Sequence, residues 1–160
     1  PDGQDTTSLH TETFKNGKSK FHYFDWKESN EIQTHGKEYP YIITTNRELE
    51  HYNAGTMTRR TRNVQILTED VLMIHPDDAS RHFIADGDMV CVESPRGKVD
   101  VKARITDEVK PGVLSSTFHF PEIMLNLITS NEHDSEAMCP EYKVVAVNIR
   151  KSKGKFKEKV

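Results

Sequence analysis

A clear alternation between residues 89 and 105 is the feature that most constrains how this chain can fold. Residues 89–93 are mostly apolar, Ser94, Pro95, Arg96 and Gly97 have the composition of a turn, and apolar side chains then recur at every second position as far as Ile105. A period of two predicts antiparallel strands joined by a tight turn. The sequence therefore predicts a hairpin, which we interpret as part of the scaffold.

Other short apolar segments extend this pattern along the chain. We expect strands or extended pieces at residues 41–43, 64–67, 71–74, 113–114 and 144–149. The helices should be short. Pro76 and the acidic residues after it predict a helix that ends before residues 86–88, with Ala79 and Phe83 on one face. Residues 123–129 have the composition of one or two further helical turns. Short, closely spaced strands without a βαβ crossover favour a β barrel over a doubly wound sheet.

Composition limits the possible classes of protein. The 160 residues suffice for one domain, with 34% apolar and 29% charged residues. No apolar run approaches the roughly 20 residues that a membrane span needs, and the first residues do not resemble a signal peptide. Cys91 and Cys139 have no second ligand at metal-binding spacing, so we expect no metal site, a buried Cys91 and a reducing, cytoplasmic location.

The chain divides into three parts by composition. Residues 1–37 are predicted to be an extension or linker with one edge strand, because residues 20–26 are dense in aromatic side chains and alternate loosely. Residues 38–150 should form the domain itself. Residues 151–160 are rich in Lys and should form a flexible basic tail.

A polar stretch at residues 38–62 stands out as a candidate site. A short apolar run leads into two Thr, an Asn, Arg47, Glu48 and His51, followed by a Gly and three more Arg. Residues 45–62 contain four Arg and two Glu, so this stretch is positively charged, although the whole chain has a net charge of −3. Arg forks, hydroxyls and backbone N–H groups suit an anionic, oxygen-rich ligand such as a phosphate. The alternative is a solvated surface loop.

Two later clusters repeat this arrangement of polar and aromatic groups. Residues 117–120 read Thr-Phe-His-Phe, with Asn126 shortly after, and residues 140–143 read Pro-Glu-Tyr-Lys before the last strand. Each residue also has a structural interpretation. Tyr142 could fill the core, Lys143 could face water, and Asn126 could cap a helix. His51 and His119 could be structural.

The order and spacing of the three clusters resemble the C-terminal molybdopterin-dinucleotide-binding domain of the molybdopterin oxidoreductase (DMSO reductase) family, most of all in formate dehydrogenase large subunits. The resemblance implies a mainly β, six-stranded double-psi β barrel with a few short peripheral helices. It also implies that the cofactor is molybdopterin guanine dinucleotide, with Mo or W held by the rest of the enzyme. The residues that it assigns to the cofactor are Arg47, Glu48, His51, Phe118, Asn126, Tyr142 and Lys143.

The same resemblance limits what this chain does alone. In that family the metal ligand, a Cys or selenocysteine, and the iron–sulfur cysteines come from upstream domains, so we expect no catalytic residue here and no formate oxidation by the isolated chain. The implied partners are the remaining domains of its own large subunit and an electron-transfer subunit, without a membrane. The alternative function is a free-standing barrel that binds an anionic partner such as nucleic acid through Arg59, Arg60, Arg62 and the tail. The net negative charge and the acidic residues between 69 and 93 disfavour that alternative.

Overall fold

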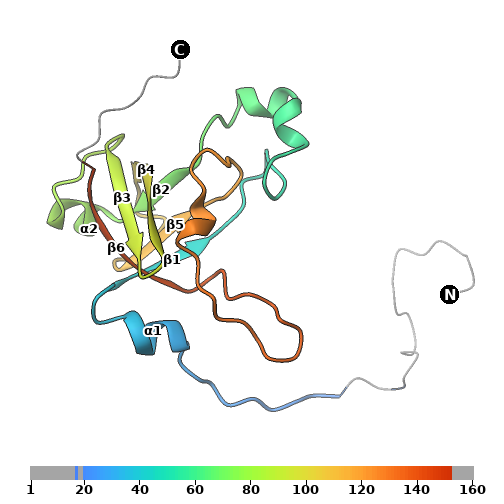
Figure 1. The fold of residues 1–160 in the computed structure, drawn as a ribbon. Helices are drawn as coiled ribbons and strands as arrows, with labels where there is room; N and C mark the ends of the chain where they lie inside the picture. Colours follow the sequence, from blue (N-terminus) through green and yellow to red (C-terminus); the bar gives the residue numbers. More distant parts are fainter. Residues whose placement is uncertain (1–16, 18–19, 153–160) are drawn as a thin grey trace, which may run out of the picture.

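Six strands close into a barrel in the computed structural model, which describes residue 17 and residues 20–152 (Figure 1). The strands are β1 Tyr41–Thr45, β2 Val71–Ile74, β3 Met89–Ser94, β4 Gly97–Ile105, β5 Val113–Ser116 and β6 Val145–Lys151. Their order around the barrel is β1-β5-β2-β4-β3-β6. The predicted mainly β, six-stranded barrel is confirmed, while its psi crossings stay a prediction.

The alternation that predicted the hairpin also builds the core. Val99, Val101 and Ala103 of β4 point inward, and β3 pairs with β4 from Met89↔Lys102 to Ser94↔Gly97. Side chains from all six strands join them in one apolar cluster. Burial of this apolar surface drives closure of the barrel. Cys91 is buried as predicted, and burial raises the pKa of its thiol.

The register of β1 decides where a site can form. β1 runs parallel to β5, with Thr45 opposite Ser116, and antiparallel to β6, with Ile43 opposite Val145. The carboxyl ends of β1 and β5 therefore lie at the same end of the barrel, next to the start of β6. Polar residues that are far apart in the sequence meet there.

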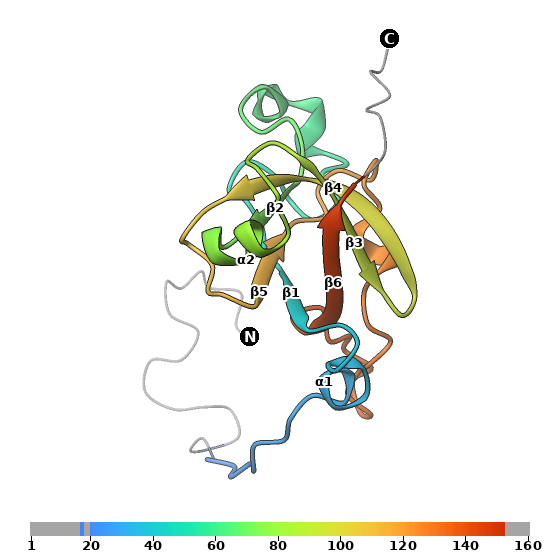
Figure 2. The same cartoon turned by 90° about the vertical axis from the view of Figure 1, so that its left-hand side faces the viewer.

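The helices are short and lie outside the barrel (Figure 2). They are α1 Asn30–His35 and α2 Pro76–Arg81, with the 3-10 turns η1 Thr58–Arg60, η2 Arg62–Gln65 and η3 Leu125–Leu127. Pro76 begins α2 as predicted, and the Asp77 N–H donates to the His75 ring. Phe83 does not share a buried face with Ala79. The helix ends before it, its φ is 53°, and its side chain is 87% exposed.

Three other sequence predictions were wrong or incomplete. Residues 64–67 are not a strand, because η2 forms where Thr61 accepts from the Asn63 N–H. Residues 20–26 form no edge strand, since no barrel strand pairs with them. The polar connection at residues 27–38 contains α1. Lys151 belongs to β6, residues 153–160 of the predicted tail lie outside the described residues, and the three-part division stays a prediction.

A buried ion pair fixes α1 to the barrel. Glu31 is 3% exposed and accepts two hydrogen bonds from Arg96, at 3.1 and 2.6 Å, in the turn between β3 and β4. The Ala146 N–H and the Ser130 hydroxyl also donate to its carboxylate. Burial would raise the pKa of Glu31, but Arg96 and these donors together hold that pKa below its usual value.

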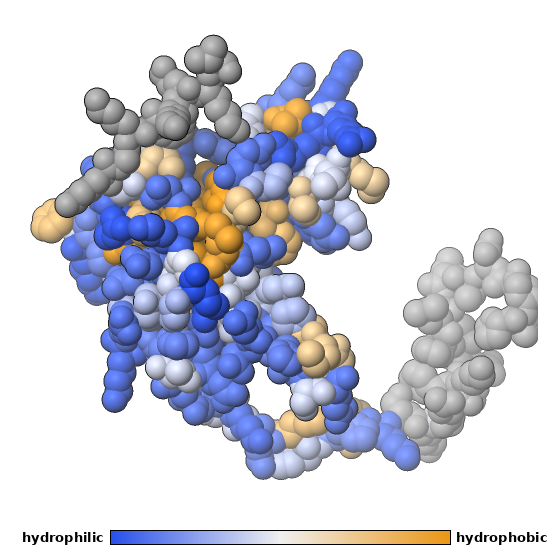
Figure 3. Space-filling model, in the orientation of Figure 1, coloured by the Kyte–Doolittle hydropathy of each residue, from blue (hydrophilic) through white to orange (hydrophobic). Residues whose placement is uncertain are grey.

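The face of the molecule drawn in Figure 3 is mostly hydrophilic. On the face shown in Figure 3, apolar side chains gather in one patch over the barrel. Within residues 20–152, no helix is long and apolar enough to cross a bilayer.

Candidate functional site

The ends of β1 and β5 and the residues before β6 meet at one end of the barrel. The Lys143 ammonium donates to the Thr45 carbonyl, and the Thr45 hydroxyl donates to the Tyr142 carbonyl at 3.2 Å. From β5, the Ser115 hydroxyl donates to Asn46 Oδ1 at 3.0 Å. These bonds bring the first and third sequence clusters together, although they lie about a hundred residues apart.

A cavity of about 280 Å³ opens at this junction. Its walls are Thr45, Asn46, Arg47, Asn53, Phe118, His119 and Lys143. Two of these residues are cationic, three carry neutral hydroxyl or amide groups, and two, Phe118 and His119, present aromatic rings. Such a set offers charge and hydrogen bonds to an anion and a flat apolar surface to a ring. The donor chemistry of the cavity therefore fits a nucleotide-like anion.

His119 ties the first cluster to the second. Its Nε2 accepts a hydrogen bond from the Glu48 N–H at 3.1 Å, and its Nδ1 lies within hydrogen-bond distance of the Asn53 carbonyl. Since a backbone N–H can only donate, Nε2 carries no hydrogen, and Nδ1 donates to Asn53. The neutral ring of this buried histidine thus holds two points of the loop after β1.

Asp70 organises the loop after β5. Its carboxylate is 1% exposed and accepts from the Thr117 hydroxyl and from the N–H groups of His119 and Phe120. Three donors satisfy a charge that would otherwise be costly to bury. Asp70 therefore positions the Thr-Phe-His-Phe segment without lining the cavity at Lys143.

The loop after β1 and the loop after β5 approach each other closely at Gly55. Gly55 has φ +68°, and a Cβ added there would lie 2.6 Å from the His119 carbonyl oxygen and 2.8 Å from Arg59 Cδ. Only Gly meets both requirements without strain. The Gly in the first polar stretch thus has a steric role.

The structure brings together six of the seven residues predicted for the site, either in the cavity wall or in contact with it. Arg47, Phe118 and Lys143 line the cavity, and the Glu48 N–H contacts His119, which also lines it. The ring of Tyr142 lies 6.4 Å from that of Phe118. Arg47 is exposed and has its guanidinium 5.6 Å above the Tyr52 ring.

His51 lies beside the cavity, with its ring 5.7 Å from that of His119, whereas Asn126 lies elsewhere. His51 is 2% exposed, and its ring nitrogens contact the Thr58 hydroxyl and the Leu67 carbonyl, both at 3.0 Å. Asn126 is exposed on η3, which packs against β4. Neither side chain lines the cavity, so cofactor contacts by these two residues stay a prediction.

Sequence reasoning missed Asn53 and Asp70. Asn53 lines the cavity, and its backbone has φ 47°, a conformation that Asn tolerates better than most residues. Its place just before Ala54 and Gly55 was the available signal for a turn. Asp70 gave no local signal, because its partners lie 47 to 50 residues away.

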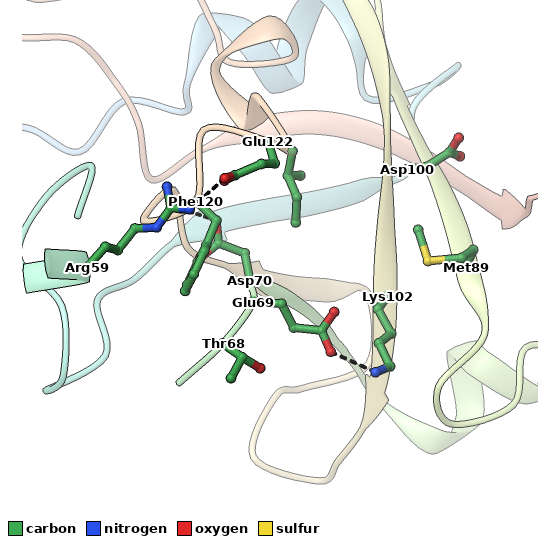
Figure 4. Close-up of a pocket in the computed structure, with 10 residues that line it drawn as sticks. Arg59, Thr68, Glu69, Asp70, Met89, Asp100, Lys102, Phe120 and Glu122 are labelled. Carbon is green, nitrogen blue, oxygen red and sulfur yellow. Dashed lines mark hydrogen bonds and ion pairs between the residues drawn. The ribbon is translucent and has the colours of Figure 1, made fainter. Parts of the chain in front are cut away.

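A second cavity, of about 360 Å³, lies beside β4 (Figure 4). Arg59 pairs with Glu122 at 2.5 Å and stands 4.8 Å above the Phe120 ring, and Lys102 pairs with Glu69 at 2.7 Å. The cations of this cavity are compensated within the chain, so it suits a polyphosphate less well. Arg59, which the nucleic-acid alternative requires, is engaged here. The described residues contain no cluster of three or more His, Cys, Asp or Glu that could hold a metal ion.

Comparison with known proteins places these features in one family. The sequence model for the molydopterin dinucleotide binding domain matches residues 41–146. The chain is 42% identical to the F420-dependent formate dehydrogenase subunit alpha of Methanocaldococcus jannaschii, over 91% of this chain and 22% of that protein. It is 38% identical to the F420-dependent formate dehydrogenase 2 subunit alpha of Methanococcus maripaludis, over 94% and 22%.

Proteins that are less similar to this chain have other names. The periplasmic nitrate reductase of Desulfovibrio desulfuricans is 32% identical, over 72% of this chain and 15% of that protein. Acetylene hydratase from Pelobacter acetylenicus shares the fold, with a TM-score of 0.65, 16% identity, and coverage of 82% of this chain and 21% of that one. The chain spans about a fifth of the length of the formate dehydrogenase subunits that it matches. With the family match covering nearly all of the barrel, the chain belongs to the molydopterin dinucleotide binding domain family.

Proposed function

We propose that this chain is the part of a formate dehydrogenase large subunit that holds one molybdopterin guanine dinucleotide. The observation that carries the proposal is the convergence of Arg47, Phe118 and Lys143 on one cavity, inside the region that matches the family. The relatives at 42% and 38% identity are formate dehydrogenase alpha subunits, which supports formate over nitrate as the substrate of the whole enzyme.

In this proposal the two cations bind the pyrophosphate. Arg47 is exposed and can turn its fork toward phosphate oxygens, and Lys143 is held at the cavity by the Thr45 carbonyl. Phe118 and Tyr142 offer ring surfaces beside it. The contact of Glu48 with His119 uses only the backbone N–H, so the Glu48 carboxylate can accept from an amine of the pterin.

The chain positions the cofactor, and the cofactor when bound supplies the two-electron chemistry that converts formate to CO2. The Mo or W ligand and the electron-transfer centres would come from polypeptide outside this chain. We therefore propose that the remaining domains of the large subunit and an electron-transfer subunit are its partners. Cys91 and Cys139 are both free thiols, which supports a reducing, cytoplasmic location.

The binding half of the proposal is tested with guanosine diphosphate, a fragment of the cofactor, titrated into the chain and followed by amide NMR. Saturable shifts are expected at Arg47, Asn53, Phe118 and Lys143. Lys143→Ala should weaken binding about tenfold, because it removes a charge-assisted contact. Arg150→Ala, which removes an exposed cation from β6, should not. Shifts limited to residues 59–62 and lost in salt would instead support nonspecific attraction of phosphates.

The substrate is tested on the full-length large subunit, with a redox dye as the electron acceptor or donor. Formate-dependent reduction of the dye is expected. Nitrate-dependent oxidation of the reduced dye, without formate activity, would overturn the choice of substrate and leave the cofactor-binding role intact.

A further inference from the structure

Four large aromatic side chains stand exposed on the segment that leads into α1, residues 20–29. Their exposed fractions are 104% for Phe21, 87% for Tyr23, 82% for Phe24 and 84% for Trp26. The segment runs away from the barrel in both ribbon views (Figures 1 and 2). Isolated exposed aromatics are ordinary, but four within six residues form an apolar surface that the barrel does not cover.

The segment has the pattern of a strand and lacks a strand to pair with. Residues 20–26 alternate, so that in an extended chain Phe21 and Tyr23 share one side and Phe24 and Trp26 the other. The Tyr23 hydroxyl donates to Asp25 Oδ1 at 2.7 Å on the first side. Among the described residues, no barrel strand pairs with this segment, so its backbone groups remain available for a partner.

The point at which the segment leaves the barrel is fixed. It runs into α1, which the buried Glu31 anchors to Arg96, and the Ser29 hydroxyl donates to Glu141 at 2.7 Å. The aromatic surface is therefore presented from a defined position, and not from a free end of the chain.

The comparisons show that a similar protein also contains this segment. It lies outside the region that matches the family, residues 41–146. The match to the formate dehydrogenase subunit of M. jannaschii covers 91% of the chain, so it includes residues 20–26 wherever it begins. That relative has more than three quarters of its length outside the match. A large body of polypeptide thus accompanies the segment in the relative.

The available area suits contact between domains. A packed aromatic side chain buries about 150–250 Å², so four of them would bury about 600–1,000 Å². Interfaces between domains of one chain bury about 600–1,500 Å². We propose that residues 20–26 dock in extended form in an apolar groove of the large-subunit polypeptide outside this chain, which covers both sides of the segment and fastens the cofactor-binding barrel to the rest of the enzyme. This inference rests on the proposed function, because it requires that polypeptide.

Hydroxyl-radical footprinting with mass spectrometry measures the docking, since the oxidation rate of an aromatic side chain follows its exposure. The isolated chain is compared with the full-length large subunit. Oxidation of residues 20–26 should fall about fivefold or more in the full-length subunit, as expected when an exposed side chain becomes buried. Phe83, which is 87% exposed in the loop after α2, is the matched reference for the dose of radicals.

Paired variants give a second measurement. Replacing both Phe24→Ser and Trp26→Ser should lower the melting temperature of the full-length subunit and leave that of the isolated chain unchanged, whereas Phe83→Ser should change neither.

Equal oxidation of residues 20–26 in both proteins would overturn the proposal. So would protection of the isolated chain that grows with its concentration, which would identify a second copy as the partner, or protection only after an electron-transfer subunit is added. Bound dinucleotide is quantified in the same samples. An unprotected segment with dinucleotide present overturns the docking alone, and absence of dinucleotide overturns the proposed function.

Discussion

At the scale of single residues, the site depends on groups that position the loops around the cavity. Gly55 permits two loops to touch, His119 holds the Glu48 N–H and the Asn53 carbonyl, and Asp70 gathers three donors. Each acts through contacts between segments that are distant in the sequence. Substitutions at these positions should therefore displace the residues that line the cavity more than they change the charge of the cavity.

Gly55→Ala should destabilise the chain more than a left-handed backbone alone requires. Alanine at positive φ costs about 1–2 kcal/mol, and the collision with the His119 carbonyl adds about 1–3 kcal/mol. Gly87→Ala is the matched control, because Gly87 has φ +81° and open space around it. Urea unfolding of both variants measures the difference. Equal losses would show that the contact with His119 has no energetic importance.

At the scale of elements, the short helix α1 is fastened to the barrel by buried contacts. Its six residues are too few to be stable alone, so its helical form depends on tertiary contacts. Glu31 supplies them through Arg96, Ser130 and the Ala146 N–H. One carboxylate thus joins α1, the hairpin turn and β6.

Glu31→Gln should lower the free energy of unfolding by about 3 kcal/mol at pH 7, because Arg96 loses its charged partner in a largely buried position. The effect should depend on pH. The folded state lowers the pKa of Glu31, so the stability that its charge contributes is complete above the unfolded value of about 4.3 and is lost as pH falls through the folded value. Unfolding of the wild type and the variant between pH 7 and pH 3 should therefore converge in acid.

Glu38→Gln is the control for this prediction. Glu38 is exposed shortly after α1, and its loss should leave both the stability and its pH dependence nearly unchanged. A constant difference between wild type and Glu31→Gln across the whole pH range would contradict the assigned role of the charge.

The elements also show how much of the structure could be predicted from the sequence alone. The hairpin and the start of α2 were predictable, because alternation and an N-terminal Pro act locally. The three polar clusters were predictable as strand ends, and six of their seven residues do lie together. The helical form of α1 was not predictable, since Glu31 looks like an exposed loop residue until Arg96, sixty-five positions away, reaches it. The prediction for Phe83 was wrong for the opposite reason, because the helical spacing of apolar residues continues in the sequence past the end of α2.

At the scale of the whole molecule, a closed barrel has no edge strand from which to open. Every strand is paired on both sides, so partial unfolding leaves unpaired backbone on at least two strands. The described chain should therefore unfold in one cooperative step.

Urea unfolding followed by far-ultraviolet circular dichroism should show that single transition, with a slope of about 1–3 kcal/mol/M. The emission of Trp26, the only Trp in the sequence, should change little across it, because that side chain is already 84% exposed in the folded state. Two separate transitions in the dichroism would contradict a closed, cooperative barrel. A large shift of the Trp26 emission would show that the aromatic segment packs on its own barrel.

The position of β1 has a further consequence during protein synthesis. Its neighbours, β5 and β6, begin at Val113 and Val145, so a ribosome must add about seventy residues after β1 before its first partner exists and about a hundred before its second. Throughout that interval, the apolar side chains of Tyr41 and Ile43 are without their final neighbours. The barrel can close only when almost all of it has left the ribosome, which makes the newly made strand β1 a natural target for chaperones.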